Sequence, residues 1–104
     1  MTKVVSLPIA SPLIGTWGAL DEGGTTVEYA VSLTPSGFSV KATDTCDGEL
    51  GQISQVKYAD AVLSFVVTWS TGRTCECRMQ PGTKNQAQFT FTYTENEHLQ
   101  RRAT

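Results

Sequence analysis

Neither positive nor negative charge predominates in this chain of 104 residues, and the charged side chains are scattered along the sequence. Eight lysines and arginines stand against ten aspartates and glutamates, which gives a formal net charge of −2. Nucleic acids and anionic membrane surfaces are bound by clustered basic side chains. The sequence shows no such cluster, so we expect neither partner.

Long hydrophobic runs are also missing. No apolar run approaches the roughly 20 residues that span a bilayer. The apolar N-terminal stretch is broken by Ser6, Pro8 and Pro12 before it reaches the length of a signal-peptide core. The sequence therefore predicts a soluble, cytoplasmic protein with a loose N-terminal arm over 1–11 and a single domain over 12–104.

Cysteine and histidine are too few for an obvious metal site or disulfide framework. An odd number of three cysteines favours free thiols in a reducing compartment. Cys75 and Cys77 share one face of a strand without converging, so core packing is preferred over a zinc site with Cys46 and His98. A redox or disulfide role of Cys46 stays open. The acidic segment 44–49 lacks the ligand spacing of a calcium loop and is interpreted as a hairpin turn. We expect no metal and no cofactor.

The helical period hardly appears; a period of two residues takes its place. From Thr25 onward apolar and polar residues alternate, which is typical of strands with one buried face. Asp47-Gly48 suits a type I′ hairpin turn. Ile53 and Val56 can share a face only if a residue between them is bulged out. The expected strands are one that carries Trp17, followed by 26–33, 38–43, 50–58, 62–70, 74–80, 88–94 and 98–102.

Every connection between these segments is short, as in a meander of antiparallel neighbours. Pairing of the last strand, 98–102, with the strand of Trp17 would remove both free edges. The prediction is therefore an all-β, antiparallel up-and-down meander that closes into a roughly eight-stranded barrel. Trp17 would plug one end of it.

The stretch Gly15-Thr16-Trp17 resembles the Gly-x-Trp that opens the first strand of lipocalin-like and avidin-like barrels, the calycin group. The resemblance implies a calycin barrel with Trp17 packed at the closed end. In lipocalins an arginine of the last strand lies over this ring, and the resemblance implies that role for Arg101. Nitrobindin-like haem barrels are also faintly similar, and would make His98 an axial ligand. A surface histidine is the preferred interpretation.

The inward positions predict a binding protein. They carry no nucleophile with a base and no carboxylate pair, so we expect a non-catalytic protein that holds a small apolar or aromatic molecule inside the barrel. The predicted ligand contacts are Tyr29, Phe65, Trp69, Phe89 and Tyr93. An interior void of about 300 Å³ or more would favour a ligand, and a fully packed core would exclude it.

Two other function classes stay open. The first is a structural or protein-interaction module with a filled core, and the outer-face residues Ala30, Val62 and Val66 make a homodimer plausible. The second is a small enzyme that uses Tyr29 or Tyr93 as an acid, with His98 nearby. The size of the interior void separates the ligand-binding class from the filled module.

Overall fold

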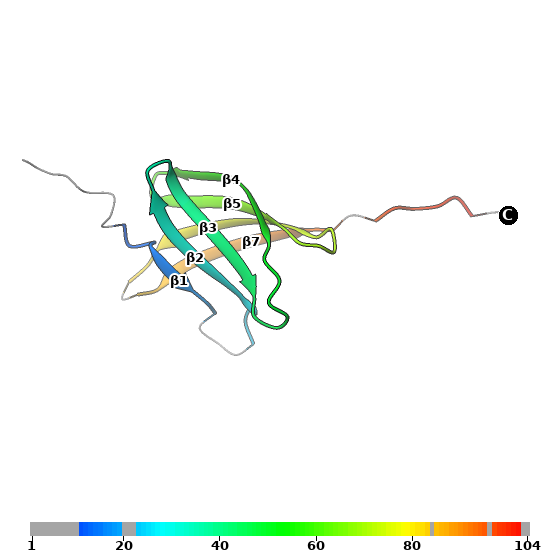
Figure 1. Cartoon of the computed structure of the whole chain (residues 1–104), viewed down its shortest axis with the longest axis horizontal. Helices are drawn as coiled ribbons and strands as arrows, with labels where there is room; N and C mark the ends of the chain where they lie inside the picture. The colour runs from blue at the N-terminus through cyan, green and yellow to red at the C-terminus, as the bar shows by residue number, and fades with distance from the viewer. Residues whose placement is uncertain (1–10, 20–22, 84, 96, 103–104) are drawn as a thin grey trace, which may run out of the picture.

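The computed structural model describes residues 11–19, 23–83, 85–95 and 97–102, and shows two antiparallel β-sheets (Figure 1). The first sheet contains β1 (Gly15–Trp17), β2 (Val27–Thr34) and β3 (Gly37–Asp44). The second contains β4 (Gln52–Ala59), β5 (Val62–Thr68), β6 (Thr74–Pro81) and β7 (Ala87–Thr94). The described part of the chain contains no helix, and hence none that could cross a membrane. The arm predicted over 1–11 falls almost wholly outside the described residues.

Within each sheet the strands follow chain order, as the meander requires. The β2–β3 hairpin runs in unbroken register from Val27 opposite Asp44 to Thr34 opposite Gly37. The chain passes from the first sheet to the second between β3 and β4. One isolated β-bridge, Thr43 opposite Leu50, joins the two sheets there. The prediction of an all-β, antiparallel structure is confirmed.

The bulge expected in the fourth strand is also confirmed. The register between β4 and β5 shifts between Ser54 and Lys57, and Gln55 adopts a φ of 54°. One extra residue in β4 at this point shifts the alternation of side chains, so that Ile53 and Val56 can point to the same face. The irregular spacing of Ile53 and Val56 was therefore a correct signal.

The type I′ turn lies at a different place from the one predicted. Asp60 and Ala61 connect β4 to β5 with φ values of 53° and 64°, the two positive values that such a turn requires. At Asp47-Gly48 only Gly48 has a positive φ, 78°, and its N–H donates to the Asp44 carbonyl at 2.7 Å. That segment is a longer loop, because β4 begins only at Gln52.

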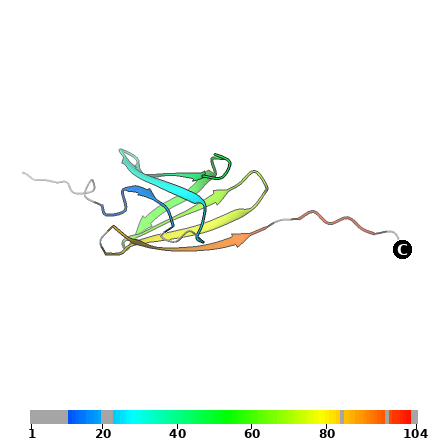
Figure 2. The ribbon, with the colours of Figure 1, turned by 90° about the horizontal axis from the view of Figure 1, so that it is seen from below.

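The core lies between the inner faces of the two sheets (Figure 2). Alternate residues of β2, β5 and β6 supply most of it, and both Cys75 and Cys77 point inward with about 1% exposure. The other fully buried members include Leu13, Val31, Ala42, Leu63, Phe65, Val67 and Met79. The two-residue period thus identified the buried face of these strands correctly.

The predicted eighth strand is not formed, and the described residues make seven strands. Residues 97–102, which we call the tail, have no regular structure and are exposed. The tail runs on from β7 and away from both sheets (Figures 1 and 2). Leu99 is its only apolar side chain, and the strand that it was predicted to pair with, β1, offers only the three residues Gly15–Trp17. Pairing there would add few backbone hydrogen bonds and little buried apolar surface to offset the ordering of the tail.

Candidate functional site

A small apolar pocket lies where β1 and β2 face the start of β7. Its volume is about 110 Å³, and we call it the seam pocket. Its apolar lining includes Trp17, Val27, Tyr29, Met79, Ala87 and Phe89, together with Ala19. Its polar lining groups come from Thr25, Asn85 and Gln86. Both sheets therefore contribute to one half-open apolar surface.

The short strand β1 positions Trp17 at this pocket. Leu13, just before β1, is completely buried and anchors the segment. The indole N–H of Trp17 donates to the Leu13 carbonyl at 2.8 Å, which fixes the ring relative to that anchor. Trp17 stands opposite Tyr29 in the β1–β2 register. The two residues therefore reach the pocket from neighbouring strands.

Tyr29 leads from the pocket into the core. Its ring centroid lies 4.8 Å from that of Phe89 and 5.7 Å from that of Phe65, so rings from both sheets touch. Its side chain is buried beside the Cys77 thiol. The Cys77 sulfur in turn lies 3.6 Å from the Cys75 sulfur.

Burial sets the protonation of this cluster. Desolvation raises the pKa of Tyr29 well above its ordinary value, and it raises the pKa values of Cys77 and Cys75 in the same direction. The phenol and both thiols consequently hold their protons at neutral pH. The cluster offers a ligand a neutral, polarisable wall rather than a charge.

The structure brings together three of the five predicted ligand contacts. Tyr29, Phe65 and Phe89 form one aromatic cluster, and two of them, Tyr29 and Phe89, line the seam pocket. Trp69 and Tyr93 lie elsewhere, in an open hollow of about 500 Å³ that also contains acidic residues of the 44–49 loop. The Arg73 guanidinium carbon stands 5.1 Å from the Tyr93 ring centroid.

Nine of the eleven residues that line the seam pocket, Trp17, Met79 and Ala87 among them, were not predicted as ligand contacts. Trp17 was predicted as a structural plug, whereas Met79 and Ala87 were not named as contacts. The alternation does place Met79 and Ala87 on inward positions, so the signal existed. What it lacked was the pairing of the two sheets, which decides which inward residues meet.

The tail holds two residues with predicted roles. Arg101, expected over the Trp17 ring, lies in this exposed segment, and the Trp17 indole is hydrogen-bonded to Leu13. His98 lies in the same segment, away from the sheets that carry Tyr29 and Tyr93 (Figure 1). Across the described ranges no three histidine, cysteine, aspartate or glutamate side chains come together as a metal site.

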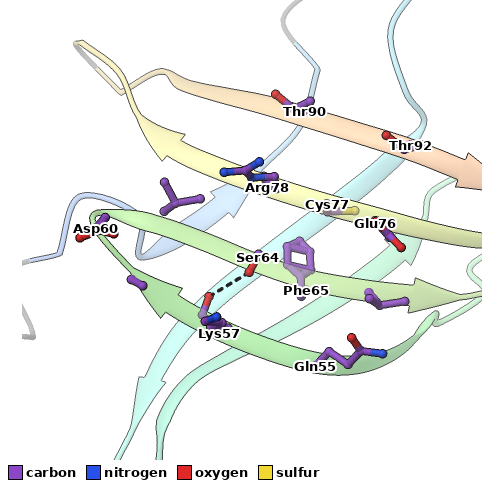
Figure 3. Close-up of a pocket in the computed structure, with 13 residues that line it drawn as sticks. Gln55, Lys57, Asp60, Ser64, Phe65, Glu76, Cys77, Arg78, Thr90 and Thr92 are labelled. Atoms are coloured by element: carbon purple, nitrogen blue, oxygen red, sulfur yellow. Dashed lines mark hydrogen bonds between the residues drawn. The ribbon is translucent and has the colours of Figure 1, made fainter.

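A second hollow, of about 650 Å³, lies on the outer face of β4 to β7 (Figure 3). Lys57, Asp60, Glu76 and Arg78 line it with mixed charge. The Ser64 hydroxyl donates to the Lys57 carbonyl at 3.4 Å. This hollow is a broad surface of mixed polar and apolar side chains, whereas the usual lining of small-molecule sites is mainly apolar. The seam pocket is therefore the stronger candidate.

No protein-family model, curated protein or solved structure matches the chain.

Proposed function

We propose that this chain is a non-catalytic, lipocalin-like binding protein with a half-open calycin-type barrel, which takes a small apolar or aromatic group into the seam pocket. The observation that carries the proposal is the half-open apolar pocket that Trp17, Tyr29, Met79 and Phe89 line from both sheets. Spaces of this kind, lined by aromatic and aliphatic side chains, are the usual sites for small ligands.

The volume limits the ligand. At about 110 Å³ the pocket is well below the roughly 300 Å³ that drug-sized molecules need. An apolar cavity of about 150 Å³ in another protein binds benzene. The expected ligand group is accordingly a single small ring or a short branched alkyl group.

The polar groups of the pocket define how such a ligand would be oriented. The Tyr29 hydroxyl lies in the buried cluster with Cys77 and Cys75. Asn85 and Gln86, in the β6–β7 turn, and Thr25, ahead of β2, remain at the rim. A ligand with an apolar ring inside and one polar substituent at this rim fits the arrangement best.

A protein-interaction module with a filled core is the second candidate function. It is favoured by the close packing of the remaining interior, where the largest core side chains are almost completely buried. In that case the seam pocket would be a packing gap without a ligand. The following experiment separates the two functions.

Trp17 is the natural reporter, because it lines the pocket whereas Trp69 does not. In a Trp69→Phe background, titration with benzene, toluene or cyclohexanol should change Trp17 emission to a saturable limit. Ala87→Met fills the pocket and should abolish this response. Ala59→Met, on an exposed strand end, is the matched control and should leave the response intact.

A response that does not saturate would contradict the ligand-binding proposal. So would a saturable response that is the same in the Ala87→Met protein. Either result would leave the filled interaction module as the better account.

A further inference from the structure

The strand β7 is an edge without the usual protection. Among the described residues it pairs only with β6. Its eight residues, AQFTFTYT, contain no charged side chain and no proline. Natural edge strands are commonly protected by lysine, proline, a bulge or a covering segment, because their free N–H and C=O groups otherwise recruit another strand. β7 is therefore suited to receive one.

The inner face of β7 is apolar and partly exposed. Phe91 and Tyr93 retain 45% and 43% of their accessible surface. Their ring centroids are 5.4 Å apart, and Phe91 lies 5.8 Å from Phe89. Phe89 is partly buried at the seam pocket, whereas Phe91 and Tyr93, farther along β7, are exposed. A strand that paired with the free edge of β7 would cover these two rings.

The tail carries an exposed apolar side chain that could cover such a ring. Leu99 is 89% exposed, although it is an apolar residue. The tail leaves its own sheet in the direction of β7 and runs away from both sheets (Figures 1 and 2). An extended segment that leaves the body in this way is positioned to reach a second molecule.

We propose that two copies of this chain form a dimer in which the tail of each copy adds as a strand to the free edge of β7 of the other. Exchange of identical elements is a low-cost route to a two-fold symmetric dimer. This inference is independent of a ligand in the seam pocket.

The alternation of side chains selects a register. With antiparallel pairing and Leu99 opposite Tyr93 of the second copy, the two-residue period sets Arg101 opposite Phe91 of that copy. Leu99 then covers one exposed ring, and the Arg101 guanidinium lies over the other. Gln100, between them, faces outward with the threonines of β7.

The same register has one unfavourable contact. It sets Glu97 opposite Glu95 of the second copy, where like charges repel. Arg73, which already lies 3.3 Å from Glu95, offsets part of that repulsion. Neutralising Glu97 should therefore strengthen the dimer, which gives the proposal a variant that acts in the favourable direction.

Light scattering of the full chain over a range of concentrations tests the assembly. The wild-type protein should be a dimer. Leu99→Asp should raise the dissociation constant at least about a hundredfold, because two leucines per dimer lose their contact. Gln100→Asp, on the outer face of the same segment, should change it less than about threefold. Glu97→Gln should lower it. A monomeric wild type, or equal effects of Leu99→Asp and Gln100→Asp, would overturn the proposal.

A cysteine experiment distinguishes exchange from closure within one chain. Tyr93 stands opposite the native Cys75 in the β6–β7 register, so the background must remove that thiol as well. In a Cys46→Ser, Cys75→Ala background, a copy with Leu99→Cys and a copy with Tyr93→Cys should form a covalent heterodimer on mild oxidation. Replacing Tyr93→Cys by Thr94→Cys, on the opposite face, should greatly reduce the yield. If a chain that carries both Leu99→Cys and Tyr93→Cys forms only an internal disulfide, the tail closes onto its own β7, and the dimer proposal is wrong.

Discussion

The two sheets meet along two seams that differ in how they are held. At the β3–β4 seam the backbone is continuous: Thr43 bridges Leu50, and the Gly51 N–H donates to the Ala42 carbonyl at 2.9 Å. At the seam between β2 and β7 the contacts are made by side chains, such as the Tyr29–Phe89 ring pair. The seam pocket and the exposed rings of Phe91 and Tyr93 lie along this second seam. At the first seam an exposed ring, Tyr58, also packs on Phe38 across the two sheets, beside the backbone contacts.

The difference follows from chain connectivity. β3 and β4 are consecutive, so a short loop brings their backbones together at little entropic cost. The strands at the other seam, β1–β2 and β7, are distant in sequence, and within the described residues no backbone pairing joins them. A seam closed by backbone tolerates little change, whereas a seam closed by side chains leaves room for a ligand or an added strand.

The closed seam should be the more sensitive to added volume. A Cβ atom at Gly51 would overlap a methyl group of the buried Val67 and lie 3.2 Å from the Trp69 ring. We expect Gly51→Ala to lower the free energy of unfolding by about 2 kcal/mol, measured by urea denaturation. At the open seam a Cβ on Gly18 meets only Glu28 Cγ, at 3.8 Å. Gly18→Ala should change stability by less than about 0.5 kcal/mol, and an equal loss at both glycines would contradict the comparison.

Alkaline pH tests whether the interior behind the open seam excludes water. The ordinary pKa of a thiol here is 9.0, and burial raises the pKa of Cys77 above it. Below about pH 9 the folded and unfolded states both keep this proton. At higher pH the unfolded thiol ionises while the folded one stays protonated, so stability falls as pH rises, by up to about 1.4 kcal/mol per pH unit for each such group.

The matched variants for this experiment are Cys77→Ala and Cys46→Ala. The first removes one buried thiol and should make the alkaline loss of stability less steep. The second removes an exposed thiol and should leave the slope unchanged. Denaturation curves between pH 7 and roughly pH 10 give the slopes. Identical slopes for wild type and Cys77→Ala would mean that water reaches the cluster.

Sequence reasoning was strongest where a local pattern decides the structure. The alternation through Val27, Tyr29 and Val31 predicted the buried face of β2, and the spacing of Ile53 and Val56 predicted the bulge. Both depend on neighbours within a few residues. The type I′ turn was misplaced because Asp-Gly is its favoured dipeptide, whereas the short β4–β5 connection imposes that geometry on Asp60-Ala61.

Long-range features could not be predicted in the same way. Whether the segment after β7 pairs depends on the strand that it would meet, and β1 offers only three residues. The period of side chains in the tail does not contain that information. The same applies to the site: the pattern identified Tyr29 and Phe89 as inward, but the relative placement of the sheets put Trp17 beside them and Trp69 in another hollow.

The smallest effect is expected at the far end of β7, where Arg73 contacts both Glu95 and the Tyr93 ring. Its guanidinium lies 3.3 Å from the Glu95 carboxylate, and both side chains are largely exposed, so water and salt weaken the ion pair. Glu95→Gln should cost at most about 0.5 kcal/mol of stability, and high salt should remove that difference. Arg73→Gln also removes the cation–π contact with Tyr93 and should cost about 0.5–1 kcal/mol, part of which persists in salt. Urea denaturation at low and high salt measures both losses. If the two variants lose the same free energy under both conditions, the Tyr93 ring contributes nothing, and side-chain contacts at this seam are weaker than the comparison requires.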